Sequence, residues 1–456
     1  MTRKGVLPLS RSSVLAGLAL SPAVARAGTQ PADFRRLAPT PPMGWNSWDS
    51  FEPTITEEQA RANAAVMATR LLPHGYDIFT VDIQWYEPGA DDYDDRKGAE
   101  LTTDEWGRPM PAPDRFPSAA NGAGFKPLAD FAHGLGLKFG IHIMRSVPRQ
   151  AADRNMPILG TDVRAGDITG RVNVCSWNTD MYGVDMSKPG AQAYYDSVFR
   201  LYASWGIDFV EADDMSRPYL RSAPEIEAVR NAIDHCGRPM ILSLSPGETP
   251  LAAADHVWQH ANMWRISDDF WDTWPLLLEQ FARLANWNPY RRSGNWPNAD
   301  MLPLGLLELG KRRTRVTPDE QTTLLTLWSI ARSPLIMGGD LRQLDDATCT
   351  LLTNDEVLAA NQTSRGNREV FCEGGQAAWT GEEAHTGDHY VALFNLRDTT
   401  PAVTASRVPI SLAQLGIGGV VRVRDLWRRR AAGTARHRFA PSIPCHGAGL
   451  YRLSNI

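Results

Sequence analysis

Short apolar runs alternate with longer helical patterns between about Met43 and Gly339. The runs are rich in β-branched and aromatic residues, as is typical of buried strands, and they fall at residues 78–82, 138–144, 207–213, 240–245, 263–267 and 333–337. Strands that alternate with helices predict a parallel sheet with crossover connections. The alternation is long for one doubly wound sheet, and no G-x-G-x-x-G motif follows the first strand. We therefore expect a closed (β/α)8 TIM barrel.

The chain changes character after Asn361. Strand-like stretches at residues 390–395 and 420–426 are separated by Gly-rich and polar turns, without a convincing long helix. This pattern predicts a C-terminal antiparallel β-sandwich. A length of 456 residues also exceeds the roughly 200–300 residues over which one hydrophobic core usually grows. We expect a catalytic barrel over residues 38–360 and a sandwich domain over residues 366–456.

The first 27 residues have the pattern of a secretory signal peptide. Arg3, Lys4 and Arg11 precede the apolar run at residues 14–20, and the small-residue sequence at 25–27 fits a cleavage site. The apolar run is much shorter than the ~20 residues that cross a bilayer. We therefore expect an exported protein, periplasmic or extracellular, with no membrane partner.

Composition and charge narrow the possible partners. The chain has 47 basic and 52 acidic residues and a formal net charge of -5, so it lacks the basic field that attracts nucleic acid. Its five cysteines show no metal-ligand spacing, and there is no phosphate-binding loop. We expect neither a metal nor an organic cofactor. Export would permit one or two disulfides, although the odd count leaves at least one thiol. The sequence carries no indication of the oligomeric state.

Polar residues stand at the carboxyl ends of several predicted strands, where a barrel places its functional groups. Glu211 and Asp213 end one strand and share a face, because strand side chains alternate. Asp82, Arg265 with Asp269, and Asp300 end or follow other strands. A single Asp at a strand end is, however, more often a turn residue or a helix cap.

Several carboxylates at one barrel face indicate a glycosidase. One carboxylate can attack the anomeric carbon while a second carboxylic acid protonates the leaving oxygen. Tryptophans in the same segments suit the apolar face of a pyranose, although a Trp in a barrel is more often core. These are Trp45, Trp48, Trp85, Trp264 and Trp296. The pattern alone predicts a carbohydrate-active barrel enzyme and does not choose the catalytic pair.

A resemblance takes the interpretation further. The sequence P-P-M-G-W-N-S-W at residues 41–48 resembles the opening signature of family 27 glycoside hydrolases, the melibiase-type α-galactosidases. Residues 205–208, 264–269, 296–302 and 327–335 resemble further elements in the family's order, so the similarity extends from about residue 38 to the C-terminus. The resemblance implies the same barrel followed by a β-sandwich.

Position by position, the resemblance implies a role for each candidate residue. Asp213 matches the catalytic nucleophile and Asp269 the general acid/base of a double displacement that retains configuration. The positions that match the lining of the sugar pocket are Trp48, Asp82, His142, Glu211, Arg265, Asp300 and Met301.

The chain departs from the family at several of these positions. Glu211 stands where the family usually has Lys, Ile83 where it has a second Asp, and His142 where it has Tyr. Met215 replaces a Cys, and residues 245–247 replace a C-E-W loop. These departures imply that the pocket differs from that of a standard α-galactosidase.

We hypothesise that Glu211 has an electrostatic effect on the site. Its charge would raise the pKa of a neighbouring carboxylate, unless Arg145 or Arg265 compensates it.

Three functions remain. The first is an exo-acting α-galactosidase that releases terminal α-D-galactose from an oligosaccharide or polysaccharide, and we expect this one. The second keeps the mechanism and changes the sugar, as in a β-L-arabinopyranosidase or an isomalto-dextranase-like α-glucosidase. The third is a carbohydrate-binding relative without catalytic activity.

Overall fold

The computed structural model describes residues 33–91, 96–400 and 402–456. The predicted signal peptide at residues 1–27 lies outside these residues, and export stays a prediction. Within the described part of the chain, none of the helices has the length and apolar character needed to cross a bilayer.

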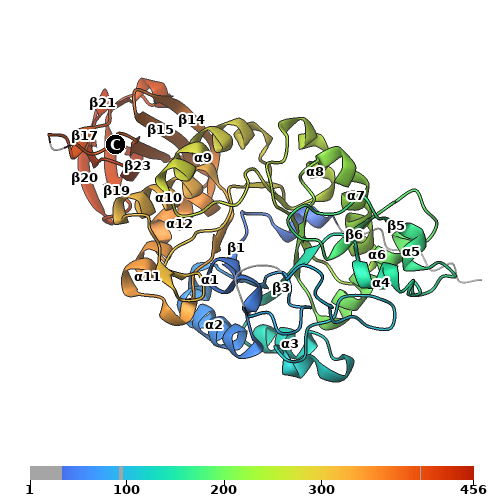
Figure 1. Ribbon diagram of the computed structural model, residues 1–456. Coiled ribbons are helices and arrows are strands. Elements are labelled where there is room, and N and C mark those ends of the chain that lie inside the picture. The colour runs from blue at the N-terminus through green and yellow to red at the C-terminus, as the bar shows by residue number, and fades with distance from the viewer. Residues whose placement is uncertain (1–32, 92–95, 401) are drawn as a thin grey trace, which may run out of the picture. The chain divides into compact units, whose positions relative to one another are not determined.

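Eight parallel strands form the centre of the fold, and their order in the sheet follows their order in the chain. They are β1 (Met43–Asn46), β2 (Ile78–Val81), β3 (Lys138–Met144), β7 (Phe209–Asp213), β8 (Ile241–Leu244), β9 (Met263–Arg265), β10 (Trp296–Asn298) and β13 (Leu335–Met337). Figure 1 shows helices around the central strands β1 and β3. An isolated parallel bridge between Leu302 and Met337 joins the segment after β10 to β13, so the two ends of the sheet meet. The predicted TIM barrel is confirmed, with a strand in each predicted run.

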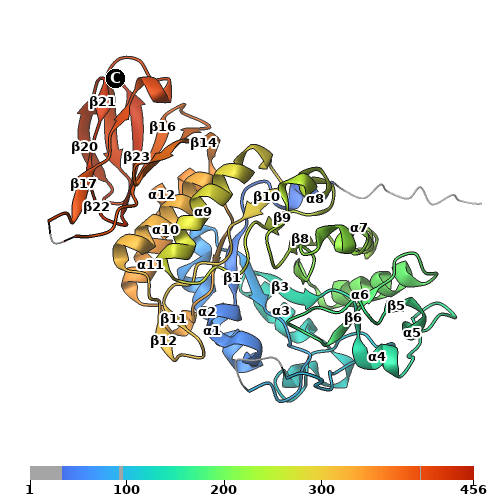
Figure 2. The same cartoon turned by 45° about the horizontal axis from the view of Figure 1, so that its top comes forward.

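Helices connect the strands and lie around the barrel (Figure 2). They are α2 (Glu57–Arg70), α3 (Lys126–Gly134), α6 (Ala191–Trp205), α7 (Tyr219–His235), α8 (Ala254–His260), α9 (Trp274–Trp287) and α10 (Pro318–Ala331), with α11 (Asp346–Leu352) and α12 (Asp355–Gln362) after β13. Capping boxes begin two of them. The Thr56 side chain accepts from the backbone of Gln59 in α2, and Thr317 does the same with Glu320 in α10.

Smaller elements occupy the loops at the carboxyl ends of the strands. Helix α1 (Trp48–Phe51) follows β1, and β11 (Leu306–Leu307) pairs with β12 (Arg312–Arg313) after β10. The connection from β3 to β7 is longer and contains a three-stranded sheet. Its elements are β4 (Val147–Pro148), α4 (Arg149–Asp153), α5 (Ala165–Ile168), β5 (Thr169–Gly170) and β6 (Met181–Val184).

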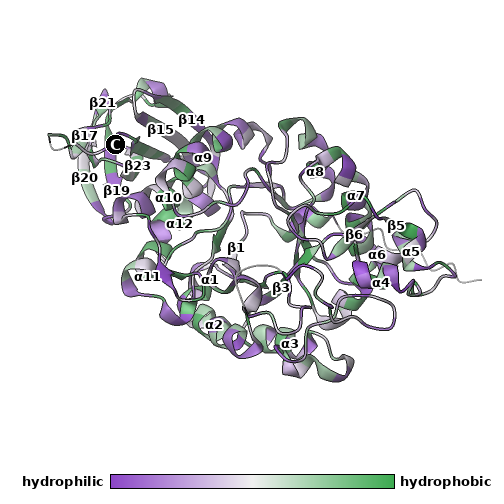
Figure 3. Cartoon of the chain, viewed as in Figure 1, coloured by the Kyte–Doolittle hydropathy of each residue, from purple (hydrophilic) through white to green (hydrophobic). Residues whose placement is uncertain are grey.

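The barrel is apolar at its amino end. Strands β1, β2 and β8 are buried at every position, as expected for parallel strands covered on both faces. The first residues of five strands pack together with Ala38 at this end, namely Ile78, Phe209, Ile241, Met263 and Trp296. Figure 3 shows the outer helices with both hydrophobic and hydrophilic residues. Because apolar side chains fill the amino end of the barrel, an open cavity can form only at the carboxyl ends of the strands.

The C-terminal part of the chain is antiparallel. One sheet has six strands in the order β14 (Ser364–Glu373), β15 (Gln376–Glu383), β16 (His389–Asn395), β23 (Ala448–Asn455), β19 (Val421–Asp425) and β20 (Arg430–Ala435). Two short pairs lie beside it: β17 (Ala405–Arg407) with β22 (Ser442–Pro444), and β18 (Ile410–Ser411) with β21 (Arg438–Phe439). Their buried apolar residues form a separate core that includes Val391, Val423 and Ile443. The predicted C-terminal sandwich is confirmed.

The other face of the six-stranded sheet packs against the barrel helices. Phe394 meets the ring of Phe281 from α9 at a centroid distance of 4.9 Å, and α10 contacts β16 and β23 (Figure 2). Residues 33–456 form one compact unit, so the boundaries predicted between the two domains stay predictions.

Candidate active site

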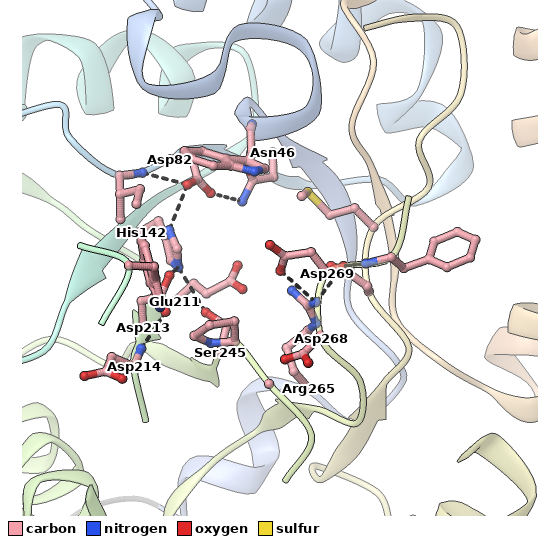
Figure 4. Close-up of a pocket in the computed structure, with 18 of the residues that line it drawn as sticks. Asn46, Asp82, His142, Glu211, Asp213, Asp214, Ser245, Arg265, Asp268 and Asp269 are labelled. Atoms are coloured by element: carbon pink, nitrogen blue, oxygen red, sulfur yellow. Dashed lines mark hydrogen bonds and ion pairs between the residues drawn. The ribbon is translucent and has the colours of Figure 1, made fainter. Parts of the chain in front are cut away.

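A cavity of about 420 Å³ opens at the carboxyl ends of the barrel strands. Its lining includes all the residues that the sequence places in the site: Trp48, Asp82, His142, Glu211, Asp213, Arg265, Asp269, Asp300 and Met301. Figure 4 shows Asp82, His142, Glu211 and Asp213 on one side of an open space and Arg265 and Asp269 on the other. The structure brings these residues together, and their individual roles stay predictions.

Asp213 is the last residue of β7 and is 4% exposed. Its Oδ1 accepts a hydrogen bond from the backbone amide of Asp214 at 2.5 Å, and its Oδ2 lies 3.2 Å from Nε2 of His142. Burial raises the pKa of Asp213 to about 6, against the opposing effect of His142. The carboxylate is therefore the principal form above pH 6, as a nucleophile requires.

His142 lies between Asp213 and a second buried carboxylate. Its Nδ1 is 2.8 Å from Oδ1 of Asp82, and its Nε2 is also 3.0 Å from Oγ of Ser245. Asp82 is itself held on both oxygens, because Asn46 donates to Oδ2 at 2.7 Å and the amide of Ile83 donates to Oδ1 at 2.8 Å. The imidazole is thus fixed by groups from neighbouring strands.

Glu211 shares a face of β7 with Asp213 and points into the cavity (Figure 4). Burial raises its pKa, while the charges of His142 and Arg265 lower it. Its own charge raises the pKa of His142, whereas the pKa of Asp213 is raised chiefly by burial. The hypothesis of compensation by Arg145 is wrong, because Arg145 is bound to other carboxylates behind the site.

The opposite wall carries Asp269, whose side chain is 54% exposed. Its Oδ1 lies 3.1 Å from Nη2 of Arg265, and the same nitrogen lies 2.7 Å from Oδ2 of Asp300. Burial raises the pKa of Asp300 to about 7 although Arg265 opposes this. One buried guanidinium is therefore shared by two carboxyl groups, of which only Asp269 is open to solvent and to a departing group.

A buried network holds the turn behind Asp213. Asp214 adopts a φ of 57°, and its carboxylate lies 2.6 Å from Nη2 of Arg145. Arg145 also contacts Glu225 at 2.7 Å, and Glu225 accepts from the hydroxyl of Tyr195 at 2.5 Å. Residues other than glycine rarely adopt a positive φ, because this backbone conformation is strained. The contacts of Asp214 with Arg145 hold it in this conformation and so fix the turn that orients Asp213.

The expectation for the tryptophans is mostly wrong. Trp48 lines the cavity, but Trp45, Trp85, Trp264 and Trp296 are at most 1% exposed. Their indole faces pack on core residues, as Trp45 does on Phe79 at a centroid distance of 4.8 Å. These four rings are therefore part of the close-packed core and are not available to a sugar.

Sequence reasoning missed several lining residues. Asn46 ends β1 and carries the same strand-end signal that identified Asp82. Asp49 also lines the cavity, and burial, followed by the charge of Asp300, raises its pKa well above the usual value. Trp177 comes from the long β3–β7 connection and Trp271 from the loop after β9. No strand periodicity marks such loop residues.

Each cysteine is free in the structure.

A TIM barrel with carboxyl groups on opposite walls of its carboxyl-end cavity is the arrangement that a glycoside hydrolase of the two-carboxylate type requires. Comparisons with known proteins agree. Residues 174–363 match the family model described as alpha galactosidase A, and residues 373–453 match the alpha galactosidase C-terminal beta sandwich domain.

Similar proteins cover nearly the whole chain. A family 27 β-L-arabinopyranosidase from Geobacillus stearothermophilus is 49% identical, with a TM-score of 0.89, over 92% of this chain and 98% of that chain. A proposed α-N-acetylgalactosaminidase from Bacillus halodurans is 45% identical, with a TM-score of 0.82, over 91% and 97%. An α-galactosidase from Cyamopsis tetragonoloba is 28% identical over 92% of this chain and 87% of its own. The chain belongs to glycoside hydrolase family 27, and the protein is a retaining glycoside hydrolase.

Proposed function

We propose that this enzyme is a β-L-arabinopyranosidase that removes terminal sugar units from an oligosaccharide or polysaccharide. The observation that carries the proposal is Ile83, which lines the cavity directly after Asp82. An aliphatic side chain offers no hydrogen bond, and burying a hydroxyl group against it is costly.

The sugar's shape explains why this matters. β-L-Arabinopyranose has the ring configuration of α-D-galactopyranose but lacks the hydroxymethyl group. A wall with Asp82 and Ile83 can bind a ring hydroxyl through the carboxylate and can pack the aliphatic side chain on an unsubstituted ring carbon. A galactoside would bring its primary hydroxyl to the apolar part of this wall.

The names of the relatives give unequal support. The β-L-arabinopyranosidase at 49% identity supports the proposal. The α-galactosidases at 27–28% identity support α-D-galactosidase, the activity expected from the sequence, as the second candidate. We place arabinopyranoside first because the more similar protein and the chemistry of Ile83 agree.

In the proposed reaction, Asp213 attacks the anomeric carbon while the bond to the leaving oxygen breaks. Asp269 gives its proton to that oxygen. Asp269 then takes a proton from water, whose oxygen attacks the same carbon and releases the Asp213 carboxylate. Two inversions restore the original configuration.

The proposal predicts at least about tenfold higher kcat/KM for p-nitrophenyl β-L-arabinopyranoside than for the α-D-galactopyranoside, because small pocket differences discriminate by about 10–200-fold. Ile83→Ala should reduce this ratio about tenfold by making room for the hydroxymethyl group. Ile78→Ala is the matched control, since Ile78 is as buried as Ile83 but lies at the amino end of β2. A wild-type preference for the galactoside would overturn the proposal in favour of the second candidate.

The titration of Asp213 predicts an acid limit for activity. The pKa of this carboxyl is raised to about 6, and only the ionised form can attack. The kcat/KM of the free enzyme should therefore reach its plateau about one pH unit above 6, fall to about half of it near pH 6, and decrease further at lower pH. A profile that stays flat to pH 4, with the fold intact by circular dichroism, would contradict a nucleophile in this environment.

A further inference from the structure

His142 lies at the centre of a cluster of three carboxylates. Asp82 follows β2 on one side, and Glu211 and Asp213 come from β7 on the other. His142 and Glu211 are register partners on the adjacent parallel strands β3 and β7, so their side chains leave the sheet on the same face. Figure 4 shows the imidazole between Asp82 and Asp213, with Glu211 beside it.

The contacts of the ring favour one protonation state. Nδ1 lies 2.8 Å from Oδ1 of Asp82, and Nε2 lies 3.2 Å from Oδ2 of Asp213. A neutral imidazole has one N–H donor, whereas these two carboxylates each require a donor. Asp82 is fixed as an acceptor by the N–H groups of Asn46 and Ile83. The imidazolium cation can donate to both carboxylates at once, whereas a neutral ring would donate to one of them and could accept at Nε2 from the Ser245 hydroxyl.

We propose that His142 is the cationic partner of the nucleophile: the imidazolium, oriented by Asp82, holds the Asp213 carboxylate ionised and in place for attack. The proposal rests on the assignment of Asp213 in the proposed function. It gives His142 a role beyond lining the sugar pocket, because the imidazole contacts the attacking carboxylate itself.

The electrostatics of the cluster support this role. Burial alone lowers the pKa of His142, but the charges of Asp82 and Glu211 and the hydrogen bonds to Asp213 and Asp82 raise it well above its usual value. The cation therefore persists at a pH where an ordinary histidine is neutral, and it is lost as the pH rises through the raised pKa. The other charged residues that line the same cavity are Asp49, Asp214, Arg217, Arg265, Asp268, Asp269 and Asp300.

The cation also fits the course of the reaction. Before attack, three carboxyl groups lie around one imidazolium, and formation of the ester at Asp213 relieves the repulsion between their negative charges. When Asp213 becomes an ester, its charge disappears, and Asp82 and Glu211 remain beside the imidazolium. An ester oxygen is a weaker hydrogen-bond acceptor than a carboxylate. Nε2 of His142 can then donate instead to Oγ of Ser245, which lies 3.0 Å away.

Kinetics of His142→Gln test the proposal, with His74→Gln as the matched control. His74 also contacts a carboxylate, Asp355 at 2.6 Å, but lies at the protein surface. With p-nitrophenyl β-L-arabinopyranoside, His142→Gln should lower kcat by about 10²-fold, as expected for the loss of a buried charged partner. Its acid limb should move to higher pH, because Asp213 loses the cation. A rise in KM alone, with an unchanged pH profile, would show that His142 only binds sugar.

A second measurement does not depend on turnover. Selective ¹⁵N labelling of the ten histidines, with the His142 signal assigned by its absence in His142→Gln, reports the protonation of the ring directly. We expect both ring nitrogens to stay protonated above pH 6.5, the ordinary histidine pKa, and a lower titration point in Asp82→Asn. A neutral ring at pH 6 would overturn the inference even in an active enzyme. Failure to hydrolyse any glycoside would instead count against the proposed function, and the ¹⁵N result would still decide the charge of His142.

Discussion

Replacing Asp213 with alanine should lower kcat/KM by at least about 10⁴-fold, because removal of a covalent nucleophile abolishes the step that forms the intermediate. The loss should be similar for good and poor leaving groups, since both require the same attack. Asp208→Ala provides a matched control. This aspartate directly precedes β7 at the opposite end of the barrel, where it contacts His133 and Arg238.

Azide distinguishes a lost nucleophile from a damaged fold. The Asp213→Ala variant leaves space on the face of the sugar that the carboxylate attacked. Azide can enter there and displace an activated aglycone once, which gives α-L-arabinopyranosyl azide with inverted configuration. Residual activity of more than a tenth of the wild type would mean that another carboxylate, with Glu211 as the first candidate, is the nucleophile.

Replacing Asp269 with alanine should have an effect that depends on the leaving group. General acid catalysis contributes about 10²–10⁴-fold, so alkyl arabinopyranosides, which need a proton on the departing oxygen, should lose about that much. Nitrophenolates leave without a proton, so the first step with nitrophenyl substrates should be nearly preserved. The intermediate should then accumulate, because water is no longer deprotonated.

Azide again separates the alternatives. In Asp269→Ala, azide should attack the accumulated intermediate and give β-L-arabinopyranosyl azide with retained configuration. Asp268→Ala, a neighbouring exposed carboxylate that contacts Arg217, should lose much less activity. An equal loss for nitrophenyl and alkyl substrates in Asp269→Ala would contradict its role as the general acid. Asp300, which shares Arg265 with Asp269, would then be the next carboxyl group to test.

The sequence predicts the barrel well because burial imposes a recognisable composition on each parallel strand. Strand β3 (Lys138–Met144) coincides with its predicted run, and β2, β7, β8, β9 and β13 lie within theirs. Strands β1 and β10 lie outside the predicted runs. The long connection between β3 and β7 was not anticipated. Its two short strands β4 and β5 pair only with β6, and pieces of two residues have too little periodicity to predict.

The site is predictable where a single strand supplies the signal. Glu211 and Asp213 share a face by alternation alone, and both line the cavity. Contacts between strands are not predictable in this way. The link from Asp82 to His142 and the binding of Arg145 to Asp214 depend on the closed barrel. The buried tryptophans show the same limit, because only packing decides whether an indole faces the core or the cavity.

We propose that this pocket cleaves β-L-arabinopyranosides with retention of configuration. Proton NMR of the wild-type enzyme with p-nitrophenyl β-L-arabinopyranoside, recorded within minutes and before mutarotation, tests both parts at once. We predict that arabinose is released and that its β-anomer appears first, followed slowly by the α-anomer. Initial release of the α-anomer, or release of galactose but not arabinose from the matched substrates, would contradict it.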